Sequence, residues 1–292
     1  MTEMRPGRGG LPVYWSRAVV NDLGPEASPS AYRVFQDDDD RFATIVEQAG
    51  HRISYPLKPP AHKWVEAILF VCISQRLWLE RHGVIPRVCD SPWQFKPSLL
   101  ASLCPQILLS EEVAFLPAGN LARQPDRLPD RFFIRPDSGD KAFPGQVIKK
   151  SDIGLLFATH RIRHDDFVMI GLESHIDLEV RCFVSRRSGS PRIVTASPYS
   201  HAPGHDRGGS RGNLGRLFTP AFDADSEDKI QRLLLSDAFR PLAQLLPDMF
   251  VADFAFCGSQ VRLIEINSVS TSGSYDCNVP AIIAEINALS GA

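Results

Sequence analysis

The sequence predicts an α/β (α+β) protein, because its two halves carry different patterns of apolar residues. In residues 11–115, short apolar segments alternate with helical ones, which is typical of a small α/β domain. In residues 131–292, runs of β-forming residues are joined by short Gly and Ser turns, which predicts antiparallel pairing. Residues 116–130 are rich in Pro, Gly, Asn, Arg and Asp without periodicity, so we expect a linker between two domains.

Besides a helix expected over Arg41–Ala49, which follows the acidic run Asp37–Asp40, the first half contains two predicted helices and several short strands. Leu11–Trp15 is expected to be the first strand. The longest helix is predicted over His62–His82, where the apolar window Ala67–Ser74 would form its buried face. A second helix is predicted around Pro97–Cys104, followed by a strand at Gln106–Leu109. These elements carry no motif that indicates a chemistry.

The second half begins with a strand that ends in a cation, Arg131–Arg135, and a returning strand at Gln146–Ile148. Between them, the loop Asp137–Gly145 holds glycines and Lys141. Backbone N–H groups and an ammonium in such a loop can face a polyphosphate, although Asp-Ser-Gly-Asp is also an ordinary turn. The following segments predict three more strands and a last helix: Phe167–Leu172, Asp177–Val184, Arg192–Ser197 and Pro280–Leu289.

The segment that most clearly indicates a functional site is a predicted hairpin. It consists of two runs of β-forming residues, Phe250–Cys257 and Val261–Asn267, joined by a turn at Gly258-Ser259. Successive strand residues point to opposite faces. One face is therefore expected to hold Val261, Leu263, Glu265 and Asn267, and the other Arg262, Ile264 and Ile266. Asp253 on the partner strand comes opposite Glu265 and Asn267 if the register allows.

Asp253, Glu265 and Asn267 would form an all-oxygen ligand set that suits Mg²⁺. Carboxylates inside apolar strands are costly unless they are paired or bound to a metal. The alternative for Glu265 is an ion pair with Arg262 or another base, with Asn267 merely starting a turn. In the strand Asp177–Val184, Glu179 and Arg181 share a face and either pair with each other or line a cleft.

Composition and charge exclude several classes of protein. The 292 residues are 43% hydrophobic and 23% charged, as in a soluble globular protein, and the net charge of −2 gives no global attraction to polyanions. Neither nucleic acid nor a membrane is therefore implied as a partner, and a homodimer is compatible with the sequence. The six cysteines show no CxxC spacing and no signal peptide is visible, so we expect reduced thiols and a cytoplasmic location.

The order of these segments resembles the ATP-grasp superfamily of nucleotide-dependent ligases. The resemblance covers residues 131 to about 278, and its most specific part is Glu-x-Asn at a strand end with an Asp on the strand before it. The matching pattern runs through Arg135-Pro136, the loop to Gly145, Phe167–Leu172, Glu179-Val180-Arg181, Asp253 and Glu265-Ile266-Asn267. The resemblance implies antiparallel sheets that clamp a nucleotide, preceded by a small α/β N-terminal domain.

The resemblance also implies roles for individual residues. Arg135 would hold the α and β phosphates of ATP, and Lys141 would lie over the β and γ phosphates. Glu179 would bind the ribose hydroxyls, and Arg181 would face the acyl-phosphate or its tetrahedral successor. The segment expected at the adenine edge contains Met169, Gly171, Leu172 and Glu173, and the expected Mg²⁺ ligands are Asp253, Glu265 and Asn267.

Two positions depart from the family pattern. Arg135 stands where most members have a lysine, which keeps the charge but adds a fork suited to phosphate. Position 251 is Val, where an arginine often precedes the metal-binding Asp by two residues. One of three arginines in the loop that follows residue 200 would then replace it: Arg207, Arg211 or Arg216.

The activity implied by the resemblance is an ATP- and Mg²⁺-dependent carboxylate–amine ligase that uses an acyl-phosphate. Its substrates would be a small-molecule or peptide carboxylate and an amine. Two alternatives stay open, a kinase-like phosphotransferase and a nucleotide-binding module without turnover. We expect Asp253→Asn or Glu265→Gln to abolish turnover while the stability of the fold changes little.

Overall fold

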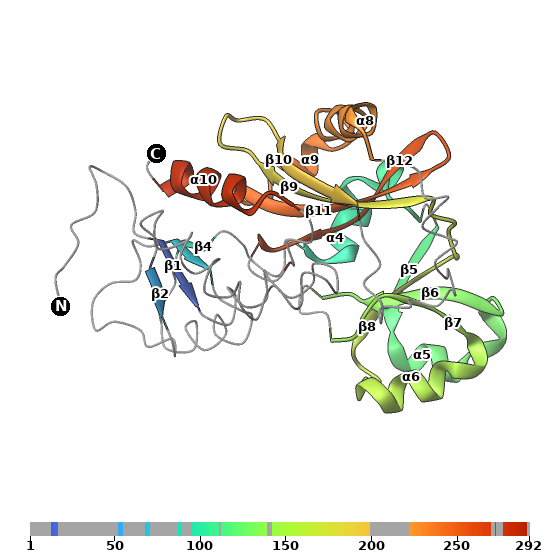
Figure 1. Cartoon of the computed structure of the whole chain (residues 1–292). Helices are drawn as coiled ribbons and strands as arrows, with labels where there is room; N and C mark the ends of the chain where they lie inside the picture. The colour runs from blue at the N-terminus through green and yellow to red at the C-terminus, as the bar shows by residue number, and fades with distance from the viewer. Residues whose placement is uncertain are drawn as a thin grey trace, which may run out of the picture.

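The structure is a computed structural model with three four-stranded sheets (Figure 1). It describes residues 95–110, 112–138, 142–198, 222–269, 272 and 277–290, together with four short strands between residues 13 and 88. We call the three sheets, in chain order, the N-terminal, middle and C-terminal sheets. In the part of the chain that the structure describes, no helix has the length and apolar character needed to cross a membrane.

The N-terminal sheet is parallel, with the strand order β2-β1-β3-β4. Its strands are β1 (Val13–Ser16), β2 (Arg52–Ser54), β3 (Ile68–Phe70) and β4 (Arg87–Val88). The first predicted strand is confirmed by β1. The helix predicted over His62–His82 is wrong at Ile68–Phe70, which pairs with both β1 and β4. Periodicity does not separate a short apolar run in a buried parallel strand from one in a buried helix.

The middle sheet is antiparallel and has the order β5-β8-β6-β7. It comprises β5 (Val113–Pro117), β6 (Arg131–Pro136), β7 (Gln146–Lys149) and β8 (Phe167–Gly171). Helices α5 (Ala118–Arg123) and α6 (Ile153–His160) cover one face, where their Leu121 and Leu156 pack with Phe132 and Ile134 of β6. Arg135 and Met169 alternate with these core residues and therefore lie on the other face.

The segment expected to be a linker is ordered secondary structure. Residues 116–130 contain the end of β5, all of α5 and the 3-10 helix η4 (Pro125–Arg127). Leu121 of α5 is almost fully buried in the core of the middle sheet. Pro and Gly signals here mark tight turns between short elements rather than a flexible connection. The division of the chain into domains at this segment stays a prediction.

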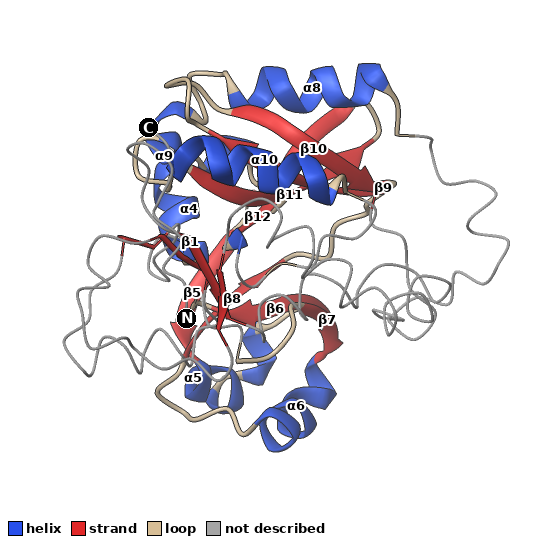
Figure 2. Cartoon of the chain, turned by 60° about the vertical axis from the view of Figure 1, so that its left-hand side comes forward, coloured by secondary structure: helices blue, strands red, loops and turns tan. Residues whose placement is uncertain are grey.

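The C-terminal sheet is antiparallel and has the order β10-β9-β11-β12. It comprises β9 (Leu178–Ser185), β10 (Arg192–Pro198), β11 (Met249–Cys257) and β12 (Gln260–Asn267), and the predicted hairpin is confirmed by β11 and β12. The accompanying helices are α4 (Pro97–Leu103), α8 (Ala224–Leu234), α9 (Arg240–Ala243) and α10 (Val279–Ser290). Figure 2 shows α8 and α10 on opposite sides of this sheet.

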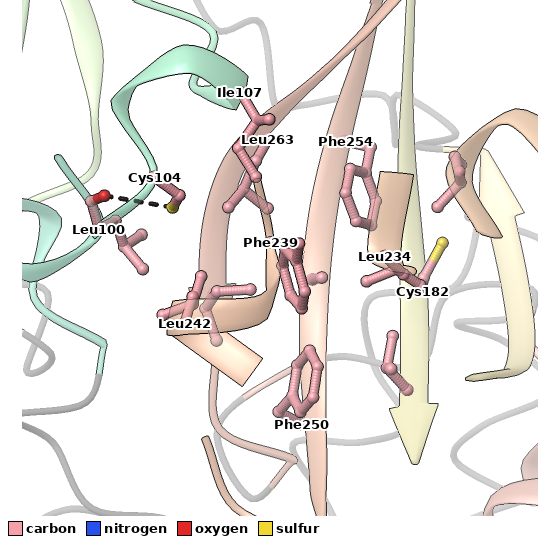
Figure 3. Close-up of a cluster of buried hydrophobic side chains, with 14 of the residues drawn as sticks. Leu100, Cys104, Ile107, Cys182, Leu234, Phe239, Leu242, Phe250, Phe254 and Leu263 are labelled. Carbon is pink, nitrogen blue, oxygen red and sulfur yellow. Dashed lines mark hydrogen bonds between the residues drawn. The ribbon is translucent and has the colours of Figure 1, made fainter. Parts of the chain in front are cut away.

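The main hydrophobic core lies between the C-terminal sheet and helices α4, α8 and α9 (Figure 3). Phe239 stacks on Phe250 of β11 with ring centroids 6.3 Å apart, and Phe254 lies on the same side of the strand. Cys182 of β9 and Leu263 of β12 complete this layer. The residues of β9 and β11 that face this core occur at every second position, so Arg181 and Asp253 project from the opposite face.

A β-bulge in β12 changes the face predicted for its residues. Asp253 pairs with Glu265, but the next residue of β11, Phe254, pairs with Leu263, so Ile264 is extra. Leu263 and Ile266 both face the main core, whereas strict alternation places them on opposite faces. The expectation that Leu263 shares a face with Glu265 is therefore wrong. Because of the bulge, Leu263 is buried in the main core while Glu265 still lies beside Asp253.

Helix α10 packs on the face of the C-terminal sheet opposite the main core, and its buried Glu285 carboxylate binds residues of β9 and β10 and of the turn between them. Ser185 Oγ of β9 donates to Glu285 Oε1 at 2.6 Å, and Arg187 Nε donates to the same oxygen at 3.1 Å. The guanidinium of Arg192 pairs with Glu285 Oε2. Burial acts to raise the pKa of Glu285, but the hydrogen bonds from Ser185, Arg187 and Arg192 together lower it below its usual value.

Glu285→Gln is expected to lower the free energy of unfolding by about 1 to 3 kcal/mol at pH 7, because it removes a charge-assisted acceptor. A carboxylate whose folded-state pKa is depressed stabilises the fold above its unfolded pKa of about 4.3, and this contribution disappears as the pH falls through the folded pKa. Urea unfolding of both proteins at several pH values tests this. If the free energies of unfolding of the wild type and the variant differed equally at pH 7 and at pH 3, this role of Glu285 would be contradicted.

Candidate functional site

The centre of the candidate site is a buried ion pair between neighbouring strands. Arg181 of β9 and Asp253 of β11 are directly opposite in the antiparallel register. Arg181 Nε donates to Asp253 Oδ1 at 2.9 Å, and Arg181 Nη2 donates to Asp253 Oδ2, also at 2.9 Å. Their side chains are 3% and 0% exposed. The bidentate geometry fixes the plane of the guanidinium in the sheet face opposite the main core.

Glu265 and Asn267 of β12 extend this pair across the next strand. Glu265 is the direct partner of Asp253 in the register between β11 and β12. The Asn267 side chain lies against both carboxylates: its Nδ2 donates to Asp253 Oδ2 at 3.0 Å and to Glu265 Oε1 at 2.8 Å. The structure therefore brings together the three residues expected to bind Mg²⁺. Asn267 does not merely start a turn.

Arg135 reaches this cluster from the middle sheet. Its Nη2 lies 2.7 Å from Glu265 Oε2, and the two side chains are 7% and 15% exposed. Glu265 is thus paired with a base, as the alternative interpretation allowed. The base comes from a different sheet, so the ion pair joins the middle and C-terminal sheets. Arg135 Nε is buried and has no hydrogen-bond partner among the residues that the structure describes.

We call Arg135, Arg181, Asp253, Glu265 and Asn267 the charged cluster. Two guanidinium groups and two carboxylates balance one another, which is required of charges removed this far from water. A buried guanidinium whose Nε has no partner among the described residues is suited to an anion such as a phosphate oxygen. The cluster therefore combines groups that can bind a polyanion with groups that can bind a cation.

The donors present fit Mg²⁺. Two carboxylate oxygens from different residues already converge on the amide of Asn267, and rotation of that amide exchanges its nitrogen for an oxygen. Two carboxylates and an amide oxygen are the hard ligands that Mg²⁺ prefers. In the described ranges, no group of three or more His, Cys, Asp and Glu residues is arranged to hold a metal ion, and this candidate set has two carboxylates and one amide.

The residues expected to contact the nucleoside lie on the same two sheets. Met169 is buried and directly opposite Arg135 in the register between β6 and β8. Gly171 ends β8, Leu172 is exposed, and the Glu173 carboxylate pairs with Arg131 at 2.8 Å. Glu179 lies two residues before Arg181 on the same face of β9. Leu178, Val180 and Cys182 of β9 face the main core, so the expectation that Glu179 and Arg181 share the other face is confirmed.

Four expected site residues fall outside the described part of the chain. They are Lys141 and the three arginines considered as replacements at position 251: Arg207, Arg211 and Arg216. Because position 251 is Val, β11 itself has no guanidinium two residues before Asp253. Arg181 of the neighbouring strand β9 places a guanidinium beside Asp253.

Two contacts position the strand that carries Arg135, and sequence reasoning missed both. Asp137 Oδ1 accepts a hydrogen bond of 2.8 Å from the backbone N–H of Ser98 at the start of α4. A Cβ on Gly145 would lie 2.8 Å from Phe133 Cζ and 3.4 Å from Arg135 Cβ. The end of the expected phosphate loop thus passes directly over the strand of Arg135. A turn motif such as Asp-Ser-Gly-Asp carries no signal for contacts this far away in sequence.

Gly145→Ala is expected to weaken the nucleotide binding that the resemblance implies by about tenfold, because the methyl group must displace the Phe133 ring, which lies two residues before Arg135 on the same face of β6. Calorimetric titration with ADP and Mg²⁺ measures this change. The matched control is Gly154→Ala in α6, where a Cβ meets nothing within 4 Å and alanine favours the helix. If the two substitutions changed the affinity for ADP equally, the close approach of the chain at Gly145 would be contradicted.

Comparisons with known proteins agree with this arrangement at the level of the fold. A scan against protein-family models and a search of the curated proteins found no match. Among solved structures, the chain is similar to a RimK-domain ATP-grasp protein from Sphaerobacter thermophilus, with a TM-score of 0.53, 11% identity and coverage of 94% of this chain and 99% of that one.

Two further solved structures are ligases. D-alanyl-alanine synthetase A from Vibrio cholerae aligns with a TM-score of 0.52 at 11% identity, covering 96% of this chain and 95% of that one. D-alanine–D-alanine ligase from Bacillus anthracis aligns with a TM-score of 0.52 at 10% identity, covering 96% and 97%. Identities this low establish architecture only. The two antiparallel sheets, their helices and these similarities show that the chain has the ATP-grasp fold.

Proposed function

We propose that this protein is an ATP- and Mg²⁺-dependent ligase that joins a carboxylate to an amine through an acyl-phosphate. The observation that carries the proposal is the charged cluster, in which Arg135 of the middle sheet meets Glu265, Asp253, Asn267 and Arg181 of the C-terminal sheet. Cations and hard oxygen ligands held together by two sheets are what phosphoryl transfer requires, because that reaction depends on positioning and charge neutralisation.

The nucleotide would lie between these two sheets. Arg135 would bind the α and β phosphates through its forked guanidinium, including the Nε that has no partner among the described residues. The backbone of Met169–Glu173 at the end of β8 would meet the adenine edge, and Glu179 would bind the ribose hydroxyls. Lys141, in the loop after Asp137, would cover the β and γ phosphates.

Asp253, Glu265 and Asn267 would hold Mg²⁺. When bound there, the ion offsets the charge on the phosphate oxygens and orients them for in-line transfer. Arg181 is held rigidly beside this position by its two hydrogen bonds to Asp253. Its guanidinium would stabilise negative charge on the acyl carbon's oxygen without having to reorganise during the reaction.

The reaction proceeds in two transfers. A substrate carboxylate oxygen attacks the γ-phosphorus, an O–P bond forms, and the bond from that phosphorus to ADP breaks. The amine then attacks the acyl carbon and a C–N bond forms. The C–O bond to phosphate breaks, and the amine nitrogen loses a proton. Arg135 and Arg181 hold the phosphates and the oxyanion through both transfers. The two substrates are a small-molecule or peptide carboxylate and an amine.

Product analysis tests the proposal. Purified protein is supplied with ATP, Mg²⁺ and a panel of amino acids and small acids, and ADP and orthophosphate are measured with and without an amine. A ligase releases both only when an acid and an amine are present together. A phosphorylated product formed without an amine would indicate a phosphotransferase. Nucleotide binding without turnover on the whole panel would indicate a binding module.

A further inference from the structure

We infer that the ion pair between Arg135 and Glu265 makes the site select metal-bound nucleotide over metal-free nucleotide. The inference rests on the proposed function, which assigns Arg135 to phosphate and Glu265 to Mg²⁺. In the structure these two groups bind each other, with Arg135 Nη2 2.7 Å from Glu265 Oε2. A phosphate that binds the Nε–Nη2 edge of Arg135 has to displace the Glu265 carboxylate from Nη2.

Metal-free nucleotide is disfavoured by this arrangement. If a phosphate draws the Arg135 guanidinium away, the Glu265 carboxylate is left without that cation and next to another negative charge. Its side chain is only 15% exposed, so water compensates it poorly. Binding of a bare polyphosphate therefore includes the cost of breaking a largely buried ion pair.

Metal-bound nucleotide avoids this cost because it brings a replacement partner for each group. The phosphate takes the place of the carboxylate on Arg135, and the cation takes the place of the guanidinium on Glu265. All charges in the cluster stay compensated. Discrimination then comes from a penalty against the wrong ligand as much as from contacts with the right one.

The pair is held by the fold, since further hydrogen bonds hold the Glu265 side chain and the strand that carries Arg135. Glu265 Oε1 accepts from Asn267 Nδ2 at 2.8 Å, which orients Oε2 toward Arg135. The strand of Arg135 is anchored two residues later, where Asp137 accepts from the Ser98 N–H of α4 at 2.8 Å. Helix α4 itself packs in the main core through Leu100. The ion pair is therefore a built feature of the site and differs from an exposed surface pair.

Isothermal titration calorimetry with ADP, in EDTA and in excess Mg²⁺, tests the inference. We expect the wild-type protein to bind ADP at least about tenfold more weakly in EDTA than in Mg²⁺. In Glu265→Gln, Arg135 has no anionic partner at this position, so metal-free ADP should bind at least about tenfold more tightly than it does to the wild type.

A double-mutant cycle separates this mechanism from a general loss of negative charge. In an Arg135→Met background, Glu265→Gln should leave metal-free ADP binding unchanged, because the effect passes through Arg135. If Arg135→Met does not fold, Arg135→Lys replaces it and should reduce the effect. Asp253→Asn removes the same charge from the cluster but keeps the Arg135–Glu265 pair, so it should not tighten ADP binding to the same degree.

Three results would overturn the inference or separate it from the proposed function. Unchanged or weaker metal-free binding in Glu265→Gln, with normal ADP binding to the wild type in Mg²⁺, would overturn the inference alone. Absence of ADP binding to the wild type under both conditions would overturn both. Tightened metal-free binding in a protein that yields no ligated product would support the inference and contradict the proposed function.

Discussion

Replacing Arg181 with Met is expected to lower the free energy of unfolding by about 3 to 5 kcal/mol. Arg181 and Asp253 are almost fully buried and share two hydrogen bonds of 2.9 Å. Methionine removes the guanidinium and leaves the Asp253 charge in the sheet without its bidentate cation. Breaking one partner of such a pair costs more than the pair itself contributes, because the remaining charge stays desolvated. Urea unfolding of both proteins measures the difference.

The matched control removes both charges together. Arg181→Met combined with Asp253→Leu should recover most of the lost stability, because neither charge then has to be buried. A double variant as unstable as the sum of the two single ones would contradict this account. The same reasoning revises one expectation from the sequence: Asp253→Asn should now lower stability, since Asp253 is the counter-ion of a buried guanidinium.

Glu265→Gln is expected to reduce turnover at least about a hundredfold, with a smaller loss of stability than Arg181→Met causes. The amide keeps one oxygen, which can accept from Arg135 in the place of Glu265 Oε2, and the side chain lies at the edge of the buried region. What it loses is the charge that would bind Mg²⁺ while the phosphoryl group moves. The measurement is ADP release at saturating ATP and Mg²⁺, once product analysis has identified an acid and an amine.

A control for this substitution is Asp166→Asn, which removes a carboxylate from another arginine pair. Asp166 Oδ1 lies 2.9 Å from Arg163 Nη2, and the Arg163 side chain is exposed on the surface near α6. Turnover should stay within about twofold of the wild type there, since exposed pairs contribute little. Full activity in Glu265→Gln would remove the assignment of Glu265 as a metal ligand.

The parts of the fold that the sequence predicted are those set by local pattern. The strands of the second half, the Gly258-Ser259 hairpin and the alternation in β9 all follow from runs of β-forming residues and short turns. Asp253, Glu265 and Asn267 were identified because polar side chains are costly in apolar strands without a partner. The structure brings all three into contact.

The parts that the sequence did not predict depend on distant contacts. Ile68–Phe70 is a strand only because β1 and β4 lie on both sides of it. The bulge at Ile264 is set by pairing with β11, and no turn residue marks it. The Arg135–Glu265 pair joins residues from different sheets. The sequence allowed, as an alternative to a metal, an ion pair of Glu265 with Arg262 or another base. The Arg262 guanidinium Nη1 donates to the carbonyl oxygen of Gln106 at 2.7 Å.

The most direct test of the central claim is a crystal structure of the protein with a non-hydrolysable ATP analogue and Mg²⁺. We expect Mg²⁺ bound by Asp253, Glu265 and Asn267, and Arg135 moved from Glu265 onto a phosphate. A nucleotide bound elsewhere, or one bound while Arg135 still pairs with Glu265, would contradict it.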